Sequence, residues 1–152
     1  MSAESNNLLA MFTYHRTVHY HETDKMGITH HSNYIKWMEE ARIFLLDSIG
    51  LSFRKMEDDG IMSPVVGINI EYKHPTTYSD LIEIDIAIAK YTGVQIIFDY
   101  TIRDTTTNTI VATATSKHCF VKDGRICVLT RSASEYDSLI KKVLQGQLPS
   151  DE

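Results

Sequence analysis

The stretch YHETDKMGITHHSNYIKWMEEAR, Tyr20 to Arg42, changes character halfway along. Up to His31 it gathers ionisable side chains around Gly27, a composition typical of a loop that serves a functional site. From Ser32 to Ile49 the apolar residues recur at helical spacing, and Gly50 follows where a helix often ends. We therefore expect one long helix directly after a polar loop. The apolar face of this helix would consist of Tyr34, Met38, Ala41, Leu45 and Ile49.

The rest of the chain is predicted to form mostly strands. In DLIEIDIAIAK, Asp80 to Lys90, isoleucines at every second position give a strand with one apolar face, opposite a face that carries Glu83 and Asp85. GVQIIFDYTIRD, Gly93 to Asp104, alternates in the same way. The other expected elements are strands at Phe12–Tyr20, Met62–Pro75, Ile110–Val121 and Arg125–Leu129, and a short amphipathic helix after Arg131.

This order of elements predicts an α+β fold, with one antiparallel sheet wrapped around one long central helix. Successive strands with hairpin-length links pair in antiparallel fashion, and one face of such a sheet must be covered by the helix. The other face would carry polar side chains that meet water or a second subunit. At 152 residues the chain fits a single domain, 1–152, with a core over about 12–130 and a C-terminal helix and tail over 131–152.

Composition and charge exclude several classes of protein. The formal net charge of −5 argues against a nucleic-acid-binding protein driven by bulk electrostatics. No apolar stretch is long enough for a membrane span, and the first ten residues lack the features of a signal peptide, so we expect a cytoplasmic protein. Cys119 and Cys127 flank an Asp-Gly turn that would place them on opposite faces of a hairpin, which makes a disulfide between them unexpected.

The residues of the opening stretch carry a resemblance to a known family. They are similar to the signature of the hotdog-fold acyl-CoA thioesterases of the 4-hydroxybenzoyl-CoA thioesterase-like group, roughly T-D-x-x-G-x-x-x-H-x-x-Y followed by E-x-A-R. The likeness continues through PVVGINIEYKHPTTYSD, 64–80, and covers roughly Thr13 to Thr130. The matching positions of the signature are Thr23, Asp24, Gly27, His31, Tyr34, Glu39, Ala41 and Arg42.

The resemblance implies a catalytic carboxylate at Asp24, acting as nucleophile or general base on a thioester. The backbone N–H near His31, at the positive end of the helix, would polarise the thioester carbonyl, and the His31 side chain would orient substrate or water. Gly27 would let the backbone approach the ligand, and Tyr34 would lie in the core beside the substrate. The resemblance further implies an acyl-CoA or acyl-carrier-protein thioester as substrate, no cofactor, and a homodimer or homotetramer with its active site between subunits.

Three other interpretations stay open at the level of sequence. His19 and His21, two residues apart on a predicted strand, could join Asp24 and the double histidine in a zinc site, although nothing in the spacing requires one and we expect no metal. A hotdog dehydratase would use a similar histidine and acid. A protein that binds acyl thioesters without hydrolysing them is the third, and an Asp24 held in a salt bridge to Lys25 or Arg16 would favour it. Glu39 and Arg42 are expected to make structural hydrogen bonds.

Overall fold

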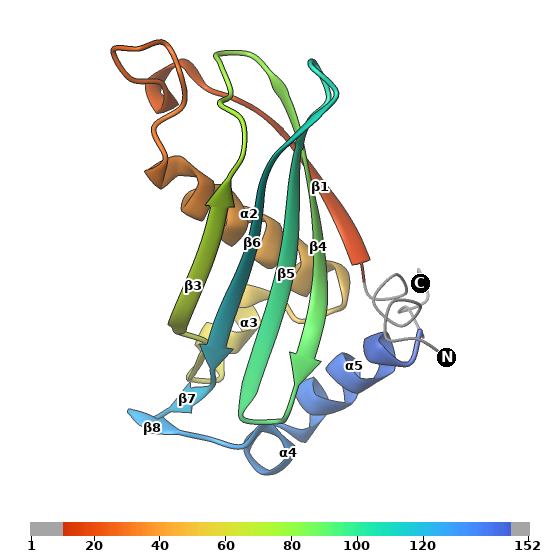
Figure 1. Cartoon of the computed structure of the whole chain (residues 1–152). Coiled ribbons are helices and arrows are strands. Elements are labelled where there is room, and N and C mark those ends of the chain that lie inside the picture. The colour runs from red at the N-terminus through yellow and green to blue at the C-terminus, as the bar shows by residue number, and fades with distance from the viewer. Residues whose placement is uncertain (1–10, 147–152) are drawn as a thin grey trace.

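The computed structural model describes residues 11–146, and the expectations for the first ten residues and for the end of the tail lie outside that range. Its main sheet has five antiparallel strands in the order β1-β4-β5-β6-β3, and a small second sheet has the order β2-β7-β8 (Figure 1). The elements are β1 (Met11–Thr17), the 3-10 turn η1 (Tyr20–Glu22), α2 (Ser32–Ser48), α3 (Phe53–Asp58), β2 (Ile61–Met62), β3 (Val65–Tyr72), β4 (Leu81–Tyr91), β5 (Gln95–Asp104), β6 (Thr109–Cys119), β7 (Val121–Lys122), β8 (Arg125–Ile126), α4 (Leu129–Ser132) and α5 (Ser134–Leu144).

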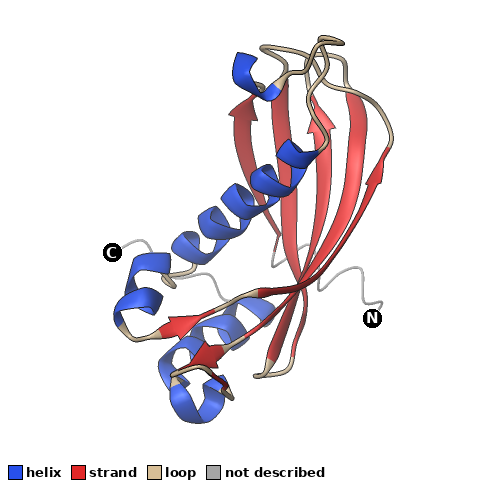
Figure 2. Ribbon diagram, turned by 90° about the vertical axis from the view of Figure 1, so that its left-hand side faces the viewer, coloured by secondary structure: helices blue, strands red, loops and turns tan. Residues whose placement is uncertain are grey.

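The predicted alternation in β4 and β5 is confirmed, and it decides which face of the sheet is buried. Every second residue is buried in β4 as far as Ile88 and along β5, and the apolar side chains among them form the core together with the apolar face of α2. Figure 2 shows α2 lying along one side of the main sheet. The opposite face is polar, as expected: there Arg103 pairs with Glu83 at 3.3 Å and with Asp85 at 3.0 Å. The buried positions of the two strands are Ile82, Ile84, Ile86, Ile88, Ile96, Phe98, Tyr100, Ile102 and Asp104.

An α+β architecture with an antiparallel sheet is therefore confirmed, but a core built around a single helix is not. α2 is the longest helix, with 17 residues, and it ends before Gly50, whose φ of 88° suits glycine. The C-terminal helix α5 contributes three more core residues, Tyr136, Ile140 and Val143. Met56 of α3 and Leu129 of α4 are also in the core, so several helices share it, and the sequence pattern made only α2 prominent.

The first predicted strand is shorter than expected. β1 ends at Thr17, and the chain then turns through η1, so that His21 does not continue the strand face of His19. The N–H of Val18 still donates to the carbonyl of Asp80 at 2.9 Å, but the partners then change: the carbonyl of Val18 accepts the N–H of Ser79 at 3.0 Å, and the N–H of Asp80 donates to the carbonyl of Thr77 at 3.1 Å, so the ladder with β4 ends. Similarly, the strand predicted at Met62–Pro75 divides into β2 and β3, and the one predicted at Arg125–Leu129 shrinks to the two residues of β8.

The Asp-Gly hairpin has the geometry that its sequence predicts. Lys122 pairs with Arg125 across a two-residue turn, and Asp123 and Gly124 have φ values of 53° and 75°, as a type I′ turn requires. The N–H of Cys127 donates to the carbonyl of Phe120 at 2.9 Å. Both cysteines are free thiols in the described structure.

Candidate active site

A tight loop joins η1 to α2, and it carries Asp24. The N–H of Asp24 donates to the carbonyl of Ile28 at 2.8 Å, and the N–H of Gly27 donates to the carbonyl of Asp24 at 3.0 Å. Gly27 has a φ of 80°, and a Cβ added there would meet no atom within 4 Å. Glycine is therefore needed for the backbone angle that closes the loop, and not to make room against the rest of this chain.

The carboxylate of Asp24 is exposed, and only one of its two oxygens accepts a hydrogen bond within the described residues. Its Oδ1 accepts the N–H of Met26 at 2.8 Å, which is an Asx turn that orients the side chain. Within residues 11–146 its Oδ2 has no hydrogen-bond partner, and no salt bridge joins Asp24 to Lys25. Arg16 is paired elsewhere, with Glu22 and Glu40. Asp24 is thus oriented by one oxygen and leaves the other available to a ligand.

Most backbone N–H groups at the start of α2 are paired: that of Ser32 donates to His30 Nδ1 at 3.3 Å, and that of Asn33 donates to the carbonyl of His30 at 3.0 Å. His31 is the N-cap residue, but its side chain makes no capping bond, and the first turn holds no acidic residue. Among the described residues no acceptor contacts the N–H of His31. The hydroxyl of Ser32 bonds His30 Nδ1 at 2.8 Å. The N–H of His31, at the positive end of the helix, therefore remains available to an anionic or polarised group.

A hollow of about 280 Å³ lies beside this helix start. Both His31 and Tyr34 line it, so the structure brings two predicted site residues together, whereas Asp24 and Gly27 are not among the residues of its wall. His31 is exposed, and its carbonyl accepts the hydroxyl of Tyr72 at 3.1 Å. The rest of the wall consists of Ile28, Thr29, Tyr72, Lys73, His74 and Pro75.

Tyr34 belongs to the core more than to the surface of that hollow. It is buried, and its hydroxyl shares a hydrogen bond with Thr76 Oγ1 at 3.1 Å. Thr76 in turn bonds Thr29 Oγ1 at 2.6 Å, so the loop after Asp24 is tied to the segment between β3 and β4. Burial raises the pKa of the Tyr34 phenol. This side chain therefore supports the wall of the hollow as a neutral group.

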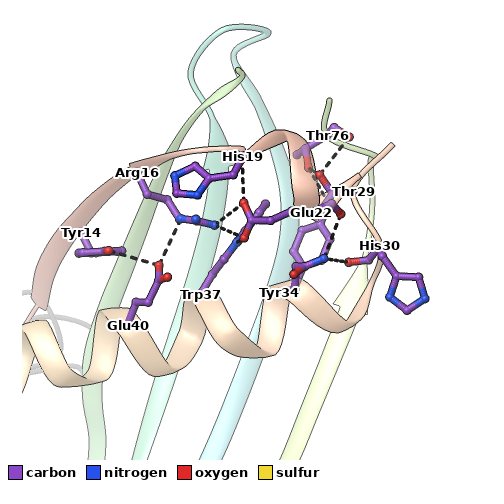
Figure 3. A network of polar contacts seen from close by, with 11 residues as sticks. Tyr14, Arg16, His19, Glu22, Thr29, His30, Tyr34, Trp37, Glu40 and Thr76 are labelled. Carbon is purple, nitrogen blue, oxygen red and sulfur yellow. Dashed lines mark hydrogen bonds and ion pairs between the residues drawn. The ribbon is translucent and has the colours of Figure 1, made fainter. Parts of the chain in front are cut away.

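Sequence reasoning missed a buried carboxylate next to the loop. Glu22 is only 5% exposed and accepts hydrogen bonds from the side chains of Arg16 and Trp37 and from the N–H of His19 (Figure 3). The guanidinium of Arg16 also lies over the Trp37 ring, 4.7 Å from its centroid. The available signal was weak: Trp37 and Glu40 lie three residues apart on α2, on a face next to its predicted core positions.

A second buried polar network lies further along α2, at Arg42. Arg42 Nη1 contacts His118 Nδ1 at 2.5 Å, and His118 Nε2 bonds Ser116 Oγ at 2.7 Å. Burial, and then the charge of Arg42, lower the pKa of His118 to about 4, so the ring is neutral near pH 7. The expected structural hydrogen bonds of Arg42 are therefore present, but they go to His118 and to the carbonyl of Ser63. Glu39 is exposed and makes none of them.

Neither a metal centre nor a membrane span emerges from residues 11–146. In that range, no three or more histidine, cysteine or acidic side chains are grouped so that they could hold a metal ion. The rings of His19 and His21 do lie close, with centroids 5.4 Å apart, but no third ligand joins them there. Within the same range, no helix has the length and apolarity that a crossing of a membrane needs.

Comparison with known proteins adds to this geometry. The family model for the thioesterase-like superfamily matches residues 18–142, which include the loop, α2 and the whole main sheet except β1. The chain belongs to the thioesterase-like superfamily. As a member it is a thioester hydrolase, the class of enzyme that the signature around Asp24 predicted.

Relatives of this superfamily member cover most of its length. YneP of Bacillus subtilis, named as a candidate acyl-CoA thioesterase, is 37% identical over 106 residues, 70% of this chain and 77% of that protein. The DHNA-CoA thioesterase from Staphylococcus aureus has a similar structure, with a TM-score of 0.84 and 27% identity over 89% of this chain and 91% of that one. The structure of a hypothetical protein from Aquifex aeolicus gives a TM-score of 0.76 at 36% identity, and the match covers 82% of this chain and 98% of that one. The fold is the hotdog fold of such thioesterases.

Proposed function

We propose that this thioesterase hydrolyses acyl-CoA, with Asp24 as nucleophile or general base and the start of α2 as the site that polarises the carbonyl. One observation carries the proposal: one short loop has at one end a carboxylate with one free oxygen, and at its other end the free backbone N–H of His31 at the start of α2. Oδ2 of Asp24 has no partner within the described residues, and neither has the N–H of His31. The Bacillus relative, named for acyl-CoA, supports the choice of substrate, and such a substrate fits the cytoplasmic location expected from the sequence.

Two routes satisfy this geometry, and both use the same two groups. In the first, Asp24 attacks the carbonyl carbon, the C–S bond breaks, CoA leaves as a thiolate that takes a proton from solvent, and water then hydrolyses the mixed anhydride. In the second, Asp24 takes a proton from a water molecule whose oxygen attacks the carbonyl carbon, and the same bond breaks. The oxyanion would face the N–H of His31 in either case, and one such donor is worth ~10²–10³ in rate.

A second copy of the chain would complete the site. β3 is an edge strand of the main sheet, and exposed apolar side chains lie along it, which is unusual for an edge that faces water. Tyr72 ends this strand and donates to the carbonyl of His31. A partner that pairs with β3 would therefore place its own residues beside the helix start. The exposed apolar residues of the strand are Val65, Val66, Ile68 and Tyr72.

The test is a hydrolysis screen over acyl-CoAs of graded chain length, with release of free thiol as the readout. We expect turnover by the parent protein. Asp24→Asn keeps the shape and the acceptor for the Met26 N–H but removes the charge, so kcat should fall by ~10²–10⁴ while KM changes little. His31→Ala should lose less, because its backbone N–H survives.

Asp123→Asn is the matched control, because it makes the same change in a turn where asparagine suits the positive φ. It should leave kcat unchanged. A parent protein that binds acyl-CoA without releasing thiol would refute the proposal in favour of binding alone. An Asp24→Asn variant with kcat within a few-fold of the parent would refute the role of Asp24.

A further inference from the structure

One face of α2 carries a polar seam that faces the end of β1 and the turn after it (Figure 3). Asn33, Trp37 and Glu40 lie four and then three residues apart, so they form one stripe on the helix. Asn33 Nδ2 donates to the carbonyl of Glu22 at 3.0 Å, and Trp37 Nε1 donates to Glu22 Oε2 at 2.8 Å. Glu40 Oε2 pairs with Arg16 Nε at 3.2 Å. The segment from Arg16 to Glu22 therefore runs antiparallel to α2: Arg16 contacts Glu40, and Glu22 contacts Trp37 and Asn33, nearer the start of the helix.

The carboxylate of Glu22 is the centre of this seam, and all of its contacts are donors. Arg16 Nη1 reaches both oxygens, at 3.0 and 2.9 Å. The N–H of His19 reaches Oε1 at 2.8 Å, and Trp37 Nε1 takes Oε2. The donors come from β1, from the turn before η1 and from α2. Because the group is buried, any displacement of one of these elements would leave a buried charge or donor unpaired.

The backbone of Glu22 also connects the turn after β1 to the start of α2. Its carbonyl accepts the N–H of His30 at 2.8 Å as well as the side chain of Asn33. Glu22 precedes Asp24 by two residues, and His30 directly precedes His31. The same residue therefore joins both ends of the loop that separates the carboxylate from the helix start.

We propose that Glu22 is a positioning residue for hydrolysis. It sets the placement of Asp24 relative to the start of α2, and this inference rests on the function proposed above. It is not a catalytic residue, because its carboxylate is buried and its acceptor positions are already filled by protein donors. A role in stability alone predicts a loss of folded protein, whereas a positioning role predicts a loss of kcat in protein that is still folded.

Glu22→Gln is the main test. It keeps the size of the side chain but removes its charge and turns an amide NH₂ toward donors. We expect kcat with a good acyl-CoA substrate to fall ~10²-fold, the scale of a misplacement of about 1 Å, with KM changing only a few-fold. Hydrogen exchange should accelerate at the bonded amides of Asp24, Thr29 and His30.

Two further variants keep the test decisive. Trp37→Phe removes one donor and keeps the charged pair of Glu22 with Arg16, so it should show the same pattern to a smaller degree and serves if Glu22→Gln does not fold. Val143→Ala truncates a buried side chain of α5, at the opposite end of the molecule from the loop (Figure 1). It should lower the melting temperature without lowering kcat at a temperature where the protein is folded.

The outcomes separate this inference from the proposed function. A folded Glu22→Gln or Trp37→Phe protein with kcat within two-fold of the parent would overturn the positioning role. The positioning role would also be overturned if Glu22→Gln and Val143→Ala lost equal stability and Glu22→Gln lost no more kcat than Val143→Ala did. If the parent hydrolyses no acyl-CoA, the proposed function fails, and the exchange rates alone decide about Glu22: unchanged rates in Glu22→Gln would show that it does not hold the loop.

Discussion

Protonation of His118 makes the stability of the fold depend on pH. The ring is 2% exposed, Arg42 contacts its Nδ1, and its pKa is lowered to about 4 by burial and by that charge. In an unfolded chain a histidine titrates near 6.5. Between pH ~6.5 and ~4 the unfolded chain therefore binds a proton that the folded protein does not. The free energy of unfolding should fall as pH falls through this window, by roughly 3 kcal/mol in all, and the contribution is fully present above pH ~6.5.

His118→Gln should flatten this acid dependence. Glutamine supplies an acceptor for Arg42 and a donor for Ser116 but does not titrate. The unfolding free energy of the variant should therefore change less between pH 7 and pH 4.5 than that of the parent. Urea unfolding at a series of pH values measures this. His15→Gln is the control, because it makes the same change at an exposed position of β1. Equal slopes for His118→Gln and the parent would contradict the assignment.

On the scale of elements, the Asp24 loop depends on the backbone of Gly27. Gly27→Ala places a Cβ where nothing clashes, so its whole cost is the strain of a φ of 80°, about 1–2 kcal/mol. The loop can relieve that strain by shifting, which should move Asp24 and lower kcat by ten-fold or more. Gly60→Ala is a matched control, with a φ of 74° and no neighbour within 4 Å. Both variants should lose similar stability in thermal unfolding, and equal kcat values would argue against a need for this loop geometry.

The elements that the sequence predicted best are those whose signal is local. The alternation in β4, the helical spacing of α2 and the Asp-Gly turn each depend on neighbours in the chain, and each was placed within a few residues. The end of β1 was missed because β-branched and aromatic residues continue to Tyr20, while the pairing with β4 ends at the distant turn from Thr77 to Asp80. The partners of Glu22 were missed for the same reason, since Arg16 and Trp37 meet it only once strand and helix have packed.

For the molecule as a whole, the unprotected edge at β3 predicts association. Edge strands of soluble monomers are usually guarded by charge or covered, yet this one exposes Val66 at 54% and Ile68 at 39% beside unpaired backbone groups. We expect the 17.3 kDa chain to be at least a dimer at micromolar concentration, measured by light scattering. Because the partner would lie beside the helix start, Val66→Glu with Ile68→Glu should yield monomers that also lose hydrolysis.

The control for this last experiment is Ile110→Lys. Ile110 is 45% exposed on β6, an interior strand of the sheet, so this variant replaces an exposed apolar side chain by a charged one without changing the β3 edge. It should leave both mass and hydrolysis unchanged. A parent protein with a mass near 17 kDa would reject association altogether, and a charged edge variant that is monomeric but fully active would place the whole site within one chain. The two measurements together therefore decide whether the hollow at α2 needs a second copy to work.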